Sequence, residues 1–133
     1  MPHLFLEYSA NIEAEIGLDA LIERLYSTAI KTGVFEPGGI RIRGVRRDRY
    51  RIADNHPENG FVHVIARIGH GRDLTTRRRV GEALFQTVCD HLQPLFDRRP
   101  LAISFELQEL DPHVSFRKNN LHEYVKTRAA HPA

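Results

Sequence analysis

The feature that most constrains this fold is a strand-helix-strand order that occurs twice along the chain. Runs of apolar or alternating residues predict strands, and apolar residues three or four positions apart predict helices. The predicted elements are, in order, a strand over 3–9, a helix over 17–32, a strand from 39 to about 52, a strand over 61–69, a helix from 73 to about 94 and a strand over 101–110. The halves, about 2–53 and 60–110, also match weakly at a spacing of 60, with His3 against His63. We interpret this order as an old duplication within a single domain, residues 1–133.

Local signals support the predicted boundaries. Gly33 is a plausible C-terminal cap for the first helix, and Pro37, Gly38 and Gly39 form a turn after it. The second helix has Asp73 as its N-terminal cap, and Pro94 should end or bend it. The residues that share the apolar faces of the two helices are Leu18, Leu21, Ile22, Leu25 and Ala29 in the first and Val80, Leu84, Phe85, Val88 and Leu92 in the second.

The repeated order predicts an α+β fold of layered α/β type, with a four-stranded mixed sheet and both helices on one face. Each unit should have a right-handed crossover. The strands carry apolar residues on both sides, but the sequence contains no further element for the opposite face, so we expect another copy of the chain to cover it. The tail, residues 111–133, has no strong pattern, although NLHEYVKTR favours a short helix with Asn119 or Asn120 as cap.

Arginine supplies almost all of the positive charge, with sixteen arginines against three lysines at a net charge of only +2. Six of the arginines lie between Arg41 and Arg51. The planar guanidinium group matches carboxylate and phosphate oxygens two at a time. The composition therefore predicts anionic partners, and both small acids and nucleic acid fit it.

The remaining composition argues against a membrane or secreted protein. No apolar run approaches the roughly 20 residues of a membrane span, and the first residues do not resemble a signal peptide. Cys89 is the only cysteine, which excludes an internal disulfide. We therefore expect a cytoplasmic protein in which Cys89 is a structural thiol. The eight histidines include no pair with the close helical spacing of a zinc site.

The second residue, Pro2, can act as a base only if Met1 is removed. Initiator methionine is commonly removed before a small residue, and removal would leave Pro2 with a free secondary amine. Such an amine can accept and return a proton, and nearby positive charge would lower its pKa toward neutrality. If Met1 is retained, the Pro2 nitrogen is an amide and cannot act as a base.

Several segments together resemble the 5-carboxymethyl-2-hydroxymuconate isomerase family of the tautomerase superfamily. They are PHLFLEYSANIE, GIRIR, IADNHPENGFVHV, RIGHGRD, FELQELDP and SFRKNN, which span residues 2 to about 120. The resemblance implies a homotrimer that uses no metal and no organic cofactor. It also implies an isomerase whose substrate is an unsaturated tricarboxylate from the degradation of homoprotocatechuate, an aromatic acid.

The resemblance also implies roles for individual residues. Pro2 matches the catalytic base, and Arg41 and Arg72 match two arginines that bind substrate. Arg43 is a further candidate for the same pocket. Phe116 and Arg117 fit either the pocket wall or a subunit contact. Val62 stands where the second half would place a counterpart of Pro2, so we expect one site per chain.

Three other functions are compatible with the pattern. One is a different tautomerase activity, such as a keto-enol tautomerase or a dehalogenase-like hydratase. A second is a nucleic-acid-binding module, because ferredoxin-like RNA-binding domains share this order of elements, although the aromatic residues that stack bases are missing from the predicted strands. The third is a trimeric assembly protein without catalysis.

Overall fold

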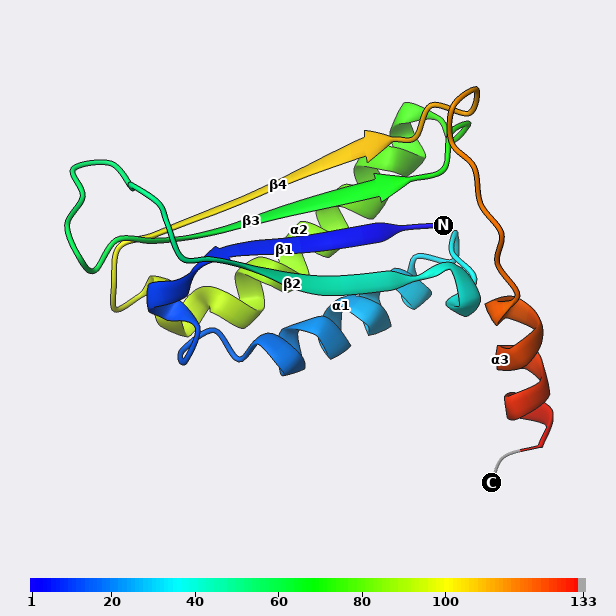
Figure 1. The fold of residues 1–133 in the computed structure, drawn as a ribbon, viewed down its shortest axis with the longest axis horizontal. Helices are drawn as coiled ribbons and strands as arrows, with labels where there is room; N and C mark the ends of the chain where they lie inside the picture. The colour runs from blue at the N-terminus through cyan, green and yellow to red at the C-terminus, as the bar shows by residue number, and fades with distance from the viewer. Residues whose placement is uncertain (132–133) are drawn as a thin grey trace.

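A computed structural model of the chain describes residues 1–131, and its elements follow the predicted order (Figure 1). Residues 132 and 133 of the predicted domain lie outside the described part. The elements are β1 (His3–Ser9), η1 (Ala10–Ile12), α1 (Leu18–Lys31), η2 (Pro37–Gly39), β2 (Arg41–Arg47), β3 (Gly60–Ile68), α2 (Leu74–Phe96), β4 (Leu101–Glu109) and α3 (Leu121–Ala130). No helix within residues 1–131 has both the length and the apolar composition needed to cross a membrane.

The strands form one mixed sheet in the order β2-β1-β3-β4. Each strand-helix-strand unit contributes a parallel pair, with Phe5 opposite Arg43 in the first and Val64 opposite Phe105 in the second. The two units meet through the antiparallel pair β1 and β3, where Leu6 lies opposite Val64. Helices α1 and α2 lie side by side on one face of this sheet (Figure 1). The predicted layered fold with two helices on one face is therefore confirmed.

The core lies between this helical layer and the sheet. In β1, Leu4, Leu6 and Tyr8 are buried at alternate positions, as expected for a strand with one face against helices. The fully or almost fully buried residues of the helices are Leu21, Leu25 and Ala29 in α1 and Val80, Leu84, Val88, Leu92 and Leu95 in α2. Phe85 differs from the prediction, because it is 37% exposed at the border of this face and its ring contacts Phe105 from the side.

Two predicted boundaries are wrong for physical reasons. Strand β2 ends at Arg47 and does not continue to Ile52, because its partner β1 ends at Ser9, the residue opposite Arg47. Of the two effects expected of Pro94, an end or a bend, the end is wrong, because helix α2 continues to Phe96. Proline lacks its own N–H donor and crowds the preceding turn, but it leaves later donors free, and the Asp97 N–H bonds to the carbonyl of Gln93.

The opposite face of the sheet combines aromatic, aliphatic and arginine side chains. Phe5, Phe61 and Ile65 are half-buried there. The guanidinium carbon of Arg43 lies 3.9 Å from the centre of the Phe5 ring, a cation–π contact. Within residues 1–131, no helix covers this face (Figure 1). The expectation that another copy covers it stays a prediction.

The C-terminal segment, residues 111–130, runs from the end of β4 across one end of the sheet to η2, where α3 packs (Figure 1). Close packing explains the glycine at position 38, since a Cβ there would lie 2.7–2.8 Å from atoms of His122. The predicted cap has two parts. Asn120 occupies the N-cap position without a side-chain bond, while the Asn119 Oδ1 atom accepts a hydrogen bond from the Leu121 N–H at 2.8 Å.

Candidate active site

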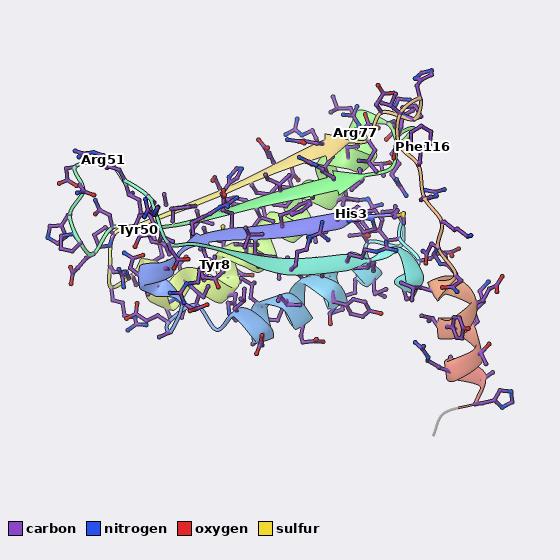
Figure 2. The ribbon with its side chains drawn as sticks, in the orientation of Figure 1. His3, Tyr8, Tyr50, Arg51, Arg77 and Phe116 are labelled. Atoms are coloured by element: carbon purple, nitrogen blue, oxygen red, sulfur yellow. The ribbon has the colours of Figure 1, made fainter. Side chains whose placement is uncertain are left out.

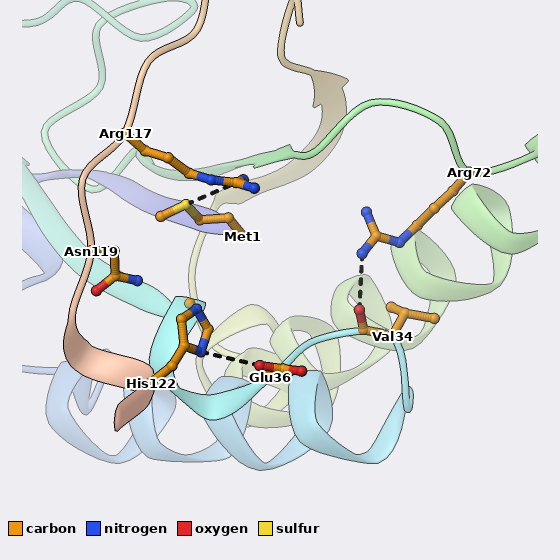
Figure 3. Close-up of a pocket in the computed structure, with 8 residues that line it drawn as sticks. Met1, Val34, Glu36, Arg72, Arg117, Asn119 and His122 are labelled. Carbon is orange, nitrogen blue, oxygen red and sulfur yellow. Dashed lines mark hydrogen bonds and ion pairs between the residues drawn. The ribbon is translucent and has the colours of Figure 1, made fainter. Parts of the chain in front are cut away.

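A cavity of about 540 Å³ surrounds the beginning of the chain, at the end of the sheet where β1 starts (Figure 3). Its lining comes from four parts of the sequence: the N-terminus, the segment around η2, the turn between β3 and α2, and the C-terminal segment. The lining residues are Met1, Val34, Glu36, Gly39, Arg72, Arg117, Asn119 and His122.

The N-terminal proline adjoins this cavity through Met1, one of the lining residues. Pro2 is buried, and its carbonyl accepts a hydrogen bond of 3.1 Å from the Arg41 N–H, which continues the pairing of β1 with β2. The Pro2 nitrogen is joined to Met1, whose side chain lines the cavity. In this form the nitrogen is an amide and has no basic lone pair. Removal of Met1 would free both the nitrogen and the space that Met1 takes up.

Arg72 reaches the cavity from the turn between β3 and α2. Gly71 has a φ of 114°, a conformation that favours glycine, and Asp73 caps α2 by accepting a 2.8 Å bond from the Thr76 N–H. Arg72 is therefore held between a glycine turn and a helix start. Its guanidinium donates to the Val34 carbonyl at 2.9 Å and to the Gly69 carbonyl at 3.2 Å.

The other predicted arginines differ in position. Arg41 is half-buried at the start of β2 and donates to the Gly39 carbonyl at 3.2 Å, so it adjoins the cavity without lining it. Arg43 lies on the open face of the sheet against Phe5 and His3, outside the cavity. Phe116 is 89% exposed and is not part of the lining, whereas the neighbouring Arg117 is (Figure 2).

Three arginines make the electrostatic potential at the chain terminus positive. Burial lowers the pKa of the Met1 amine below that of an ordinary terminus, and Arg72, Arg117 and Arg41 lower it further. His3 has a lowered pKa for similar reasons, with burial first and Arg43 second. A terminal amine in this place is therefore biased toward the neutral, proton-accepting form, and the same charges attract anions.

Two polar contacts among the lining residues were not predicted from the sequence. His122 Nδ1 lies 3.2 Å from Glu36 Oε2, and the Asn119 amide donates to the Gly38 carbonyl at 3.1 Å. These contacts join residues about eighty positions apart, which no local pattern reveals. The glycines after Pro37 were the only signal of close packing. Across residues 1–131, His, Cys, Asp and Glu side chains do not gather in groups of three or more that could hold a metal ion.

Comparison with known proteins identifies the family. A family model described as 5-carboxymethyl-2-hydroxymuconate isomerase matches residues 2–125, almost the whole chain. The chain belongs to the 5-carboxymethyl-2-hydroxymuconate isomerase family. The match confirms the resemblance noted in the sequence and extends it past residue 120 into α3, so the segment that carries Arg117 and His122 lies within the family's boundaries.

Individual relatives of this isomerase family agree. The 5-carboxymethyl-2-hydroxymuconate Delta-isomerase of Escherichia coli is 39% identical over 126 residues, which cover 95% of this chain and all of the relative. The crystal structure of a 5-carboxymethyl-2-hydroxymuconate isomerase from Deinococcus radiodurans R1 superimposes with a TM-score of 0.87 at 35% identity, over 93% of each chain.

The fold is also shared with more distant members of the tautomerase superfamily. A wild-type fused 4-OT described as a symmetric trimer has a TM-score of 0.65 at 16% identity, over 87% of this chain and 93% of the other. At this identity the similarity shows the fold alone. It confirms the tautomerase-like architecture expected from the duplicated unit.

Proposed function

We propose that this protein isomerises 5-carboxymethyl-2-hydroxymuconate in the degradation of homoprotocatechuate, with Pro2 as the general base. The observation that carries the proposal is the placement of the chain terminus in a cavity where Arg72, Arg117 and Arg41 all act on its amine. Membership of the isomerase family favours this activity over other tautomerase activities and over nucleic-acid binding.

The reaction needs one group that first accepts a proton and later returns it. After removal of Met1, the neutral Pro2 nitrogen takes the proton of the enol hydroxyl. The electron pair of the O–H bond forms the new carbonyl, the conjugated double bonds shift, and Pro2 returns the proton to a carbon of the chain. The dienol thereby becomes an enone, and no atom or electron is gained or lost.

The arginines have two roles in this scheme. Arg41 and Arg72 hold substrate carboxylates, and in the empty site their charge favours the neutral form of a terminal amine at Pro2, as it lowers the pKa of the Met1 amine. Bound carboxylates then offset part of that charge, so the Pro2 nitrogen becomes more basic when there is a proton to accept. Since both effects come from the same side chains, binding and proton transfer are coupled.

The proposal includes a homotrimer and a cytoplasmic location. A shared fold with a fused 4-OT described as a symmetric trimer supports the assembly, as does the sheet face that carries Phe5, Phe61 and Ile65. We expect a trimer mass in sedimentation at micromolar concentration, and a monomer mass would refute this part. The unpaired Cys89 supports a reducing compartment, which cell fractionation tests.

Pro2→Ala tests the base directly. Intact-protein mass spectrometry first establishes that Met1 is absent from both the wild type and the variant. An ultraviolet assay of dienol loss should then show kcat lowered by roughly 10²–10⁴-fold, the usual contribution of a general base, with a much smaller change in KM. Wild-type turnover in the processed variant would rule out Pro2 as the base.

A further inference from the structure

The two arginines that line the cavity have no carboxylate partner among the described residues. Elsewhere in residues 1–131, ion pairs with Asp or Glu engage Arg46, Arg47, Arg77, Arg78 and Arg99. Within the described residues, Arg72 donates to two backbone carbonyls, and Arg117 contacts the Met1 sulfur at 4.0 Å. The one acidic lining residue, Glu36, is paired with His122. Both guanidinium groups therefore keep donors available for an anionic ligand.

The C-terminal segment holds Arg117 in place. Two positions after Arg117, Asn119 is bonded to the Gly38 carbonyl, and His122 packs on the same glycine and pairs with Glu36. Figure 3 shows Arg117 beside Met1, with Arg72 on the other side of the cavity. The segment is thus attached to the turn that leads into Arg41, and it brings a third cation to the space above Pro2.

Arg117 also lies at the border of a second cavity. This cavity, about 350 Å³, is lined by Gly69, His70, Leu110, Pro112, Ser115 and Arg117. Because Arg117 lines both cavities, a ligand at Pro2 that carries a side arm can meet Arg117 where the two linings share it. The Arg41 and Arg72 side chains, by contrast, donate hydrogen bonds to the backbone carbonyls of Gly39 and Val34, in the segment between α1 and β2.

The number of charges on the substrate matches this arrangement. Muconate has a carboxylate at each end, and the carboxymethyl arm adds a third. We infer that Arg117 is a substrate-binding residue that recognises the carboxylate of the carboxymethyl arm and so makes the site selective for the tricarboxylate. This inference rests on the proposed function. It also assigns Arg117 to the pocket wall, one of the two roles that its sequence context allowed.

Arg117→Gln tests recognition of the carboxymethyl arm separately from binding of the rest of the substrate. The assay measures KM for 5-carboxymethyl-2-hydroxymuconate and the inhibition constant of 2-hydroxymuconate, which has the same conjugated chain without the arm. Because Arg117 is exposed, we expect about a tenfold rise in KM, less than a buried ion pair would give. The inhibition constant for the dicarboxylate should change by less than about twofold, because it makes no contact with Arg117.

Lys118→Gln is the matched control. It removes one positive charge from the adjacent, exposed position, so it reports any general loss of electrostatic attraction. Both constants should stay at the wild-type values. Arg117→Lys, which keeps the charge but loses the bidentate fork, should fall between the wild type and Arg117→Gln.

Several results would overturn the inference. They are an unchanged KM in Arg117→Gln, an equal rise in both constants, and the same effect from Lys118→Gln. If the processed wild type does not convert the tricarboxylate at all, the proposed function fails instead. In that case calorimetry measures the affinities of both acids for the wild type and for Arg117→Gln. A loss of affinity for the tricarboxylate but not for the dicarboxylate supports the role of Arg117, and equal losses overturn it.

Discussion

Replacing Gly38 with alanine should detach α3 from the glycine turn while the sheet stays folded. The added Cβ would lie 2.7 Å from His122 Nδ1 and 2.8 Å from the His122 backbone N and Cα atoms. A change of side-chain rotamer does not move the backbone atoms. To go from 2.7–2.8 Å to the ordinary contact distance of 3.4 Å, the start of α3 has to move by about 0.6–0.7 Å.

The size of the effect follows from what holds α3 down. Overpacking of this kind costs about 1–3 kcal/mol. The docking contacts opposing it are the Asn119–Gly38 hydrogen bond and the exposed His122–Glu36 pair, each about 1 kcal/mol or less. Helix α3 itself has no fully buried residue. Since the cost is similar to the docking energy, detachment of α3 is the cheapest response.

Hydrogen exchange measures this detachment. Amides of residues 121–130 should exchange faster in Gly38→Ala, while those of β1 and β3 keep their protection. KM for the tricarboxylate should rise toward the value for Arg117→Gln, because the segment that positions Arg117 is released. The double variant should then show little further loss.

Gly81→Ala is the control for a glycine-to-alanine change. Its Cβ would have Phe105 at 3.5 Å, an ordinary contact, and alanine suits the interior of α2 better than glycine by roughly 1 kcal/mol. It should leave exchange in α3 and KM unchanged. If Gly38→Ala also leaves both unchanged, the contact with His122 does not hold the segment in place and the reasoning is refuted.

Two further predictions test the electrostatic potential at the site and the packing of the hydrophobic core. Arg72 lowers the pKa of the terminal amine of Met1, and we expect the same effect on the Pro2 amine once Met1 is removed. Arg72→Gln should then raise the pKa of the Pro2 amine and move the acid limb of the kcat/KM profile to higher pH, whereas a limb that stays or moves down contradicts this. Leu84→Ala, at a fully buried position, should lower the free energy of unfolding by about 2–5 kcal/mol in chemical denaturation. The control Leu74→Ala, at a position 60% exposed, should lower it by less than about 0.5 kcal/mol. Equal losses in the two variants would count against this core.

The layered fold is predictable because its elements follow local rules. The alternation of Leu4, Leu6 and Tyr8 and the stripe from Val80 to Leu92 reflect strands and helices with one buried face. Local patterns miss the features that depend on contacts with distant segments of the chain. Strand β2 stops where β1 offers no further residue to pair with, and Phe85 stays partly exposed because it packs beside Phe105 on the edge strand β4.

The candidate site was predictable only in part, for the same reason. Pro2 and Arg72 follow from the family resemblance, and the cavity is lined by Arg72 and by Met1, the residue joined to Pro2. Arg117 had two possible roles because its position depends on how the C-terminal segment returns to Gly38. The contacts that fix this return, from Asn119 and His122, join distant parts of the chain and leave no periodic pattern.

The position of Met1 has a consequence for how the enzyme is prepared. In a chain that keeps Met1, this residue lines the cavity, and its peptide bond makes the Pro2 nitrogen an amide that cannot accept a proton. Aminopeptidase trimming would then act as a one-time activation step, much like the cleavage of a zymogen. Two batches with identical circular dichroism spectra would differ in specific activity according to how completely the host cell had trimmed them.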